Sequence, residues 1–176
     1  KSEQTMFRRV VAKLNYLQQD RPDLGFAVHR IARRMATPTP ADLPALKRIL
    51  RYIRGRQHME LFFPWQAACS RVVAWTDSDW ASCPKTRRST SGGCLMTGQH
   101  LLRHWSRLQG AIALSSGEAE LYAVNKGAAE AMGVRQMAAD LGIELEIEVK
   151  TDSTACKGIV SRKGTGKMKH VMVNQL

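Results

Sequence analysis

The spacing of apolar residues changes near residue 58, and this change divides the chain into two parts of different structural class. Before it, apolar residues recur every three or four positions, which is typical of amphipathic helices. After it, short β-branched and aromatic runs alternate with turn residues, and one long segment rich in Ala and Glu lies among them. We therefore expect a helical segment at residues 1–57, a linker or strand at 58–70 and an α/β domain at 71–176.

The first part of the chain predicts three helices separated by two proline-containing breaks. Apolar residues at helical spacing favour helices at residues 4–19 and 22–35, and a third helix that ends at Gly55. Thr39 is the expected N-cap of that third helix, because a proline follows it and Asp42 stands three residues later. The basic side chains of this helix lie largely opposite its apolar face, and they are Lys47, Arg48, Arg51 and Arg54.

The second part predicts a mixed sheet with helices packed against it. The strand candidates are residues 59–63, 71–77, 92–96, 101–106, 111–114 and 144–151. Residues 116–141 and 152–160 have the composition of helices. The turn at residues 97–100 contains Gly98 and indicates a hairpin between the runs on either side of it. Trp75 and Trp105 lie in strand candidates, and we expect both in the core.

Two aspartates stand in the same local sequence, each at the end of a predicted strand. Asp77 and Asp152 are both preceded by Thr and followed by Ser. If the two strands are parallel neighbours, the two carboxylates converge at one edge of the sheet. Converging carboxylates repel each other, and a bound divalent cation relieves that repulsion. The alternative is that each aspartate only caps the loop or helix that follows it.

The long helix supplies a third carboxylate. Ser115 and Glu118 fit a capping box, which gives Glu118 a structural role. Glu120 has no such role. It lies two residues after Glu118, and side chains two residues apart on a helix differ by about 200° in direction, so Glu120 faces a different side of the helix from Glu118. Its stripe consists of small or apolar residues that should pack on the sheet, namely Val124, Gly127, Ala128 and Ala131. Glu120 should therefore face the strand ends that carry Asp77 and Asp152.

Two aspartates and one glutamate in a basic chain indicate metal-assisted hydrolysis of a phosphodiester. Two Mg²⁺ ions roughly 4 Å apart would activate a water and stabilise the leaving oxygen. The formal net charge is +12 and the sequence pI is near 10.1, which favours a nucleic acid over an anionic membrane as the partner. Residues 1–60 carry +8 of this charge. The alternative is that the basic helices are only solvated.

Several other classes of protein fit poorly. The longest stretch without an acidic or basic residue, 89–102, is shorter than the roughly 20 apolar residues that a membrane span needs. No secretory signal is visible, so we expect an intracellular protein that is not secreted. The four cysteines form no CxxC pair, which argues against a zinc site and favours reduced thiols.

The chain resembles the C-terminal part of a copia-type LTR retrotransposon Pol polyprotein, where the end of reverse transcriptase leads into a ribonuclease H (RNase H) domain. The resemblance covers essentially the whole chain. In the α/β part the matching stretches are TDSDWAS, RRSTSGG, ALSSGEAELYA, TDSTA and GKMKHV. In the helical part they are LNYLQQDRPDLGFAV and ALKRILRYIRG. The spacing of RRSTSG and SSGEAEL is very specific.

The resemblance implies an RNase H-like fold and hydrolysis of the RNA strand of RNA–DNA hybrids. Asp77, Glu120 and Asp152 match the first three acids of the family, and they would act as catalytic residues and ligands of two Mg²⁺ or Mn²⁺ ions. The partners implied are the hybrid and the upstream polymerase region of the same polyprotein, in a cytoplasmic particle or the nucleus. No small-molecule cofactor and no membrane is implied.

The fourth acid of the family is missing from this sequence. It follows a KHI-type segment, which is Lys169-His170-Val171 here, and the next residue is Met172. The family also continues into a further helix where this chain stops, so we expect a C-terminally truncated domain. These departures imply weak or lost activity, and the alternative is an inactive nucleic-acid-binding remnant or a structural appendage of a reverse transcriptase.

The basic residues have two interpretations each. The cationic face formed by Lys47, Arg48, Arg51 and Arg54 would grip the hybrid backbone or dock the polymerase body. Arg87 and Arg88 would contact phosphates, or they would only mark the limit of the loop between two strands.

Overall fold

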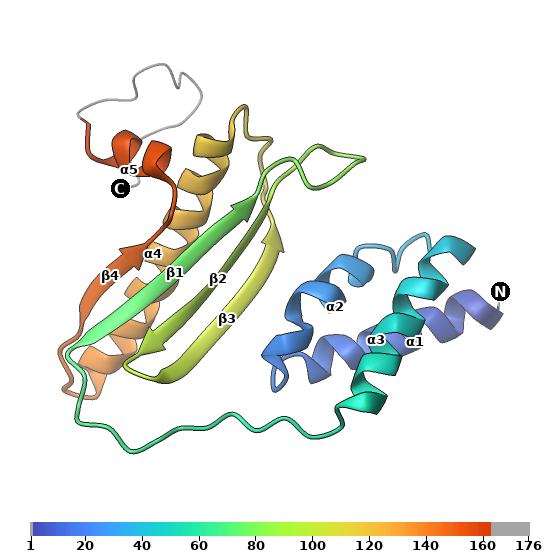
Figure 1. Ribbon diagram of the computed structural model, residues 1–176, viewed down its shortest axis with the longest axis horizontal. Coiled ribbons are helices and arrows are strands. Elements are labelled where there is room, and N and C mark those ends of the chain that lie inside the picture. The colour runs from blue at the N-terminus through green and yellow to red at the C-terminus, as the bar shows by residue number, and fades with distance from the viewer. Residues whose placement is uncertain (1, 163–176) are drawn as a thin grey trace. The chain divides into compact units, whose positions relative to one another are not determined.

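The computed structural model of the protein describes residues 2–162 and divides into two compact units, Lys1–Phe62 and Phe63–Leu176 (Figure 1). The first unit is helical and the second combines a sheet with helices, so the chain is a mixed α/β protein as the sequence predicts. No helix within residues 2–162 is both long enough and apolar enough to cross a membrane.

The first unit is built from three α-helices and two short 3₁₀ helices. Its α-helices are α1 (Ser2–Leu17), α2 (Gly25–Ala32) and α3 (Leu43–Gly55), and its 3₁₀ helices are η1 (Pro22–Leu24) and η2 (Pro40–Asp42). One apolar cluster joins them, consisting of Phe7, Val11, Leu14, Leu24, Val28, Ile31, Leu46 and Ile49. The predicted helix at 22–35 is shorter than expected. The α-helix α2 ends at Ala32. Beyond it, the N–H groups of Arg34 and Met35 donate to the carbonyl oxygens of Ile31 and Ala32, three residues earlier, and not to those four residues earlier as in an α-helix.

The capping box that opens the third helical segment is confirmed. Thr39 N–H and Thr39 Oγ1–H both donate to Asp42 Oδ2, at 2.8 and 2.7 Å. The chain then passes through η2 into α3, whose buried side is formed by Leu46 and Ile49. The basic face is exposed along its length, at Lys47, Arg48, Arg51 and Arg54.

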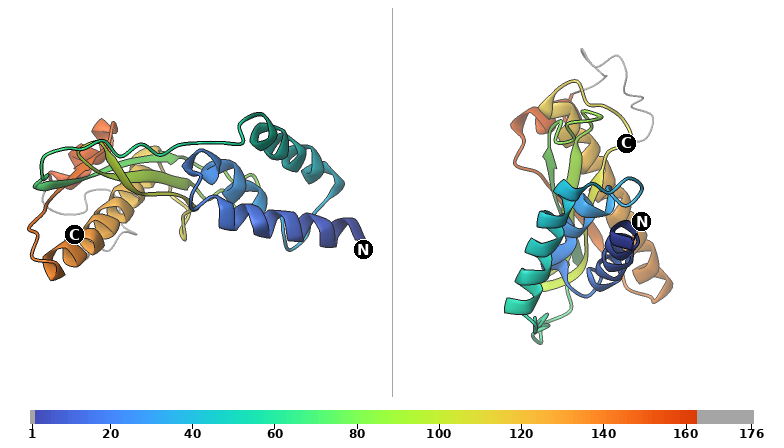
Figure 2. Two further views of the ribbon diagram at one scale, coloured as in Figure 1. Left: turned by 90° about the horizontal axis from the view of Figure 1, so that it is seen from below. Right: turned by 90° about the vertical axis from the view of Figure 1, so that its right-hand side faces the viewer.

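The second unit is a four-stranded sheet with two helices. Its strands are β1 (Arg71–Asp79), β2 (Thr90–Thr97), β3 (His100–Leu108) and β4 (Glu146–Lys150), and its helices are α4 (Ser116–Asp140) and α5 (Thr154–Val160). The strand order is β3-β2-β1-β4, as Figure 1 shows, and Figure 2 shows the sheet nearly edge-on with α4 along one of its faces. The β1–β2 and β2–β3 pairs are antiparallel, and the β1–β4 pair is parallel. The predicted mixed sheet, the hairpin and the long helix are confirmed.

One face of the sheet packs against α4. Alternate side chains of β1 point to this face, and Val72 and Ala74 are fully buried on it. Leu95, Trp105 and Ala131 complete the buried cluster. Trp75 lies on the other face and is 50% exposed, so the expectation that it is a core residue was wrong. Trp105 is buried as predicted.

Two predicted strands do not form. Residues 59–63 and 111–114 are irregular, although both runs are apolar. The linker that contains the first run is held by side-chain hydrogen bonds instead of a strand ladder. Gln66 Nε2–H donates to Thr97 O at 2.9 Å, and Gln99 N–H donates to Gln66 Oε1 at 2.9 Å. The second run leads directly into α4, where Leu114 N–H donates to Glu118 Oε2 at 2.8 Å.

Gly127 sets the distance between α4 and β1. A Cβ atom at Gly127 would overlap the Cγ2 methyl of Thr76, the residue before Asp77. We expect Gly127→Val to lower the free energy of unfolding by about 1–3 kcal/mol, because an overpacked contact forces the helix and strand apart. Denaturant unfolding measures this change.

Gly133→Ala is the matched control for the Gly127 substitution. Gly133 lies in the same helix, and a Cβ atom there meets nothing within 4 Å. Alanine should therefore be neutral or should stabilise the helix by up to about 1 kcal/mol. Equal stability of Gly127→Val and the parent would contradict the close-packing argument.

Candidate metal centre

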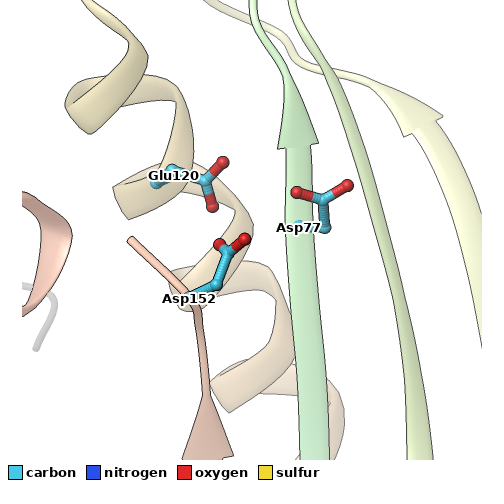
Figure 3. A group of neighbouring side chains, drawn as sticks. All are labelled: Asp77, Glu120 and Asp152. Atoms are coloured by element: carbon cyan, nitrogen blue, oxygen red, sulfur yellow. The ribbon is translucent and has the colours of Figure 1, made fainter. Parts of the chain in front are cut away.

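Asp77, Glu120 and Asp152 form one group of carboxylates. One oxygen from each lies within 4.8 Å of the others, and Figure 3 shows the three side chains converging. They come from β1, from the first turns of α4 and from the segment after β4. The parallel register aligns Trp75 with Lys150, so positions 77 and 152 lie two residues beyond the same aligned pair.

Asp77 differs in one respect from its predicted place. The strand does not end at Asp77 but continues to Asp79, because β2 pairs with it as far as Thr90. Asp77 pairs with Gly92, and a Cβ atom at Gly92 would meet nothing within 4 Å. The side chain of Asp77 is exposed, as is that of Asp152. Both carboxylates are therefore reachable from solvent.

Glu120 is the buried member of the group, with a relative exposure of 8%. Its Oε1 accepts hydrogen bonds from Ser78 Oγ at 2.8 Å and from Ser78 N–H at 3.2 Å. Burial raises the pKa of Glu120, the Ser78 hydroxyl lowers it, and the charges of Asp77 and Asp152 raise it again. Within the described part of the chain, Glu120 Oε2 is buried and has no hydrogen-bond partner.

This donor set fits a hard divalent cation. Carboxylate oxygens are the ligands that Mg²⁺ and Mn²⁺ prefer. A buried carboxylate oxygen without a hydrogen-bond donor is costly, and a cation would satisfy it. The three residues therefore have the right chemistry, and one of them, Glu120, has an unsatisfied buried oxygen.

Two of the three carboxylates open onto a groove of about 770 Å³. Asp77 and Asp152 line it together with Trp75, Lys150 and Lys157. The Lys150 ammonium lies 4.7 Å from the centroid of the Trp75 ring, and it also pairs with Glu148 at 3.3 Å. The groove thus presents an aromatic ring and two lysines beside the acids.

Glu118 has the structural role that its position predicts. Ser115 Oγ accepts from Glu118 N–H at 3.2 Å, and the Glu118 carboxylate accepts from Leu114 N–H and from Tyr122 Oη–H. The carboxylate of Glu118 is thus engaged at the start of α4, while that of Glu120 faces the two aspartates.

The other predicted site residues lie elsewhere. Arg87 and Arg88 are exposed in the loop before β2 and do not line the groove. Cys83 closes that loop, because Arg87 N–H donates to Cys83 O and Cys83 N–H donates to Arg88 O. Lys47, Arg48, Arg51 and Arg54 belong to the first unit. Met172 lies outside the described residues, as do Lys169 and His170.

Ser78 is the site residue that sequence reasoning missed. The Thr-Asp-Ser pattern placed a hydroxyl next to Asp77, and this was the available signal. The pattern alone does not show that the hydroxyl turns toward α4 and meets Glu120.

Comparison with known proteins finds relatives that include plant retrotransposon Pol polyproteins. The chain is 40% identical over 124 residues to the uncharacterized mitochondrial protein AtMg00810 of Arabidopsis thaliana, and spans 51% of that protein. It is 35% identical over 144 and 141 residues to the retrovirus-related Pol polyproteins from transposons RE1 and RE2 of Arabidopsis thaliana. These matches cover 82% and 80% of the chain but only 10% of each polyprotein. No protein-family model matches the chain, and no solved structure matches it significantly.

Proposed function

Because this chain is a homologue of copia-type retrotransposon Pol polyproteins and corresponds to about a tenth of their length, we propose that its second unit is an RNase H-like nuclease domain. The proposed reaction is metal-dependent hydrolysis of the RNA strand of RNA–DNA hybrids. The observation that carries the proposal is the convergence of Asp77, Glu120 and Asp152 within 4.8 Å, from a strand, a helix and the segment that follows a second, parallel strand.

The chemistry of the three residues fits phosphodiester hydrolysis. Asp77, Glu120 and Asp152 would hold divalent cations, and these supply an activated water and neutralise charge on the leaving oxygen when bound. Exposed Asp77 and Asp152 lie where a ligand in the groove would reach them. Buried Glu120 presents a fixed oxygen from inside the fold. The chain needs no nucleophilic side chain, because water is the attacking group.

The experiment uses a labelled RNA–DNA hybrid incubated with the purified chain in Mg²⁺ or Mn²⁺. We expect the RNA strand to be cleaved slowly, because Met172 stands where the fourth acid would be, and the DNA strand to stay intact. Single-stranded RNA and duplex DNA serve as controls. Equal cleavage of all three substrates, or cleavage of DNA alone, would refute the proposed specificity.

A second candidate is a nucleic-acid-binding remnant without turnover. One observation favours it: Met172, and not an acidic residue, follows Lys169-His170-Val171. This candidate predicts binding of the hybrid that does not depend on metal, and no cleavage in either metal.

The basic face of α3 is proposed as a contact for the nucleic-acid backbone. Its residues Lys47, Arg48, Arg51 and Arg54 are all exposed. Replacing the four with Gln should flatten the salt dependence of hybrid binding by about 0.7–0.9 log units for each phosphate that the face no longer neutralises, because fewer counterions are released. Fluorescence anisotropy at several salt concentrations measures this slope.

A matched pair of single substitutions separates a specific contact from a general charge effect. Arg51→Gln and Arg135→Gln each remove one exposed positive charge, from α3 and from α4. Only Arg51→Gln should reduce the slope. If the slope is unchanged even in the fourfold variant, the face is not a phosphate contact. Docking to a polymerase region from the same polyprotein then becomes the better explanation.

A further inference from the structure

Ser78 is placed to control the orientation of the Glu120 carboxylate. It lies on β1 between Asp77 and Asp79. Successive side chains of a strand point to opposite faces, and Ser78 lies on the face of β1 that α4 covers, where it reaches Glu120. The Ser78 hydroxyl reaches Glu120 Oε1 at 2.8 Å, and the Ser78 amide reaches the same oxygen at 3.2 Å.

Because of these two bonds, the two carboxylate oxygens of Glu120 differ in their hydrogen bonding. Oε1 receives both donors of Ser78, whereas Oε2 is buried and has no hydrogen-bond partner within residues 2–162. A carboxylate that is free to rotate would present either oxygen in a range of directions. With Oε1 held, Oε2 is presented in one direction, and the group offers an oxygen within 4.8 Å of those of Asp77 and Asp152.

We propose that Ser78 is a positioning residue whose hydroxyl fixes Glu120 so that Oε2 faces a divalent cation shared with Asp77 and Asp152. This inference rests on the proposed function and deepens it. The hydroxyl is the contribution specific to serine at position 78. Any residue except proline would still donate a hydrogen bond from its backbone N–H to Glu120. Residues that orient a metal ligand typically change metal affinity by about 10- to 100-fold when they are replaced.

A purely structural role is the competing explanation. The hydrogen bonds also tie β1 to α4, so loss of the hydroxyl would lower stability in either case. Only the positioning role predicts a change of metal affinity in the folded protein. The test therefore measures metal binding directly, under conditions where thermal unfolding shows each variant to be folded.

The experiment titrates the full chain with Mn²⁺ and follows free Mn²⁺ by electron paramagnetic resonance. We expect Ser78→Ala to weaken Mn²⁺ binding about tenfold. Ser78→Thr keeps a hydroxyl and should bind close to the parent, whereas Ser78→Val, which has the shape of the threonine variant without its hydroxyl, should bind as weakly as Ser78→Ala. Ser82→Ala is the matched control, because Ser82 Oγ bonds to Thr90 Oγ1 at 2.8 Å and does not touch the acids.

The outcomes separate this inference from the proposed function. If the parent binds Mn²⁺ and Asp77→Asn does not, while Ser78→Ala and Ser78→Val bind like the parent, the positioning role is overturned and the metal centre stands. Equal weakening in Ser82→Ala would also overturn it. If neither the parent nor Asp77→Asn binds Mn²⁺, the metal centre and the positioning role fail together.

Discussion

Replacing Asp77 with Asn is expected to reduce metal-dependent cleavage of the RNA–DNA hybrid by roughly a thousandfold, because losing one cation ligand removes several kcal/mol of transition-state stabilisation. The asparagine keeps the shape of the side chain, so the fold should not change. Initial rates at saturating Mg²⁺ and Mn²⁺ measure the effect. Asp79→Asn is the matched control, since Asp79 is exposed on the same strand and lies outside the carboxylate group. Comparable losses in both variants would contradict a specific role for Asp77.

Glu120→Gln should separate activity from stability. It should abolish cleavage because a cation ligand is lost. In metal-free solution, however, it should raise the free energy of unfolding at neutral pH. The pKa of Glu120 is raised by burial and by its acidic neighbours, so ionisation of this residue costs more in the folded state than in the unfolded chain. The parent should consequently gain stability as the pH falls toward the unfolded pKa of the glutamate, and lose that contribution as the pH rises through the raised folded value.

Thermal unfolding in chelator checks this consequence of Glu120→Gln. The difference in midpoint temperature between the variant and the parent should shrink as the pH is lowered, because the parent carboxyl becomes protonated. A midpoint that is lower than that of the parent at every pH would show that Glu120 is not under electrostatic strain.

Met172→Asp is expected to increase hybrid cleavage by at least roughly tenfold, because a fourth carboxylate supplies an oxygen ligand that a thioether cannot offer a hard cation. The gain should be larger in Mg²⁺ than in Mn²⁺, which tolerates poorer geometry. Rates for the parent and the variant in both metals test this. Met168→Asp adds the same charge to the same segment and should not raise the rate.

Two results would contradict the assignment of the fourth position to Met172. A fully active parent that Met172→Asp leaves unchanged would show that the position is misaligned. A gain of equal size in Met168→Asp would show that added negative charge alone, and not a ligand at one position, changes the rate.

The elements that depend on local sequence were predictable. The capping residues Thr39 and Ser115 fix helix starts by bonds within four residues, and both starts were placed correctly. The hairpin around Gly98 follows from its turn, where Gly98 adopts a φ of +56°. The strands at residues 59–63 and 111–114 were wrong because an apolar run becomes a strand only when a partner edge is available, and partner edges are set by distant residues.

The site was predictable in part, for similar reasons. The repeated Thr-Asp-Ser pattern and the helical phase of Glu120 were enough to bring the three acids together. Their catalytic and metal-binding roles stay predictions. The extent of β1 beyond Asp77 depends on pairing with β2, and the orientation of Trp75 depends on which face α4 covers. The bond from Ser78 to Glu120 joins residues 42 positions apart, which no local pattern reports.

The parallel pairing of β1 with β4 has a consequence for biosynthesis. The strands that carry the acids to one place lie at opposite ends of the second unit, with β2, β3 and α4 between them. Such pairings between distant segments are slow to form, because a long loop must close before any stabilising interaction forms. A nascent chain that has not yet extended past β4 lacks Asp152 and cannot assemble the three-carboxylate group. All residues that precede Asp152 in the polypeptide are therefore translated before this carboxylate group can form.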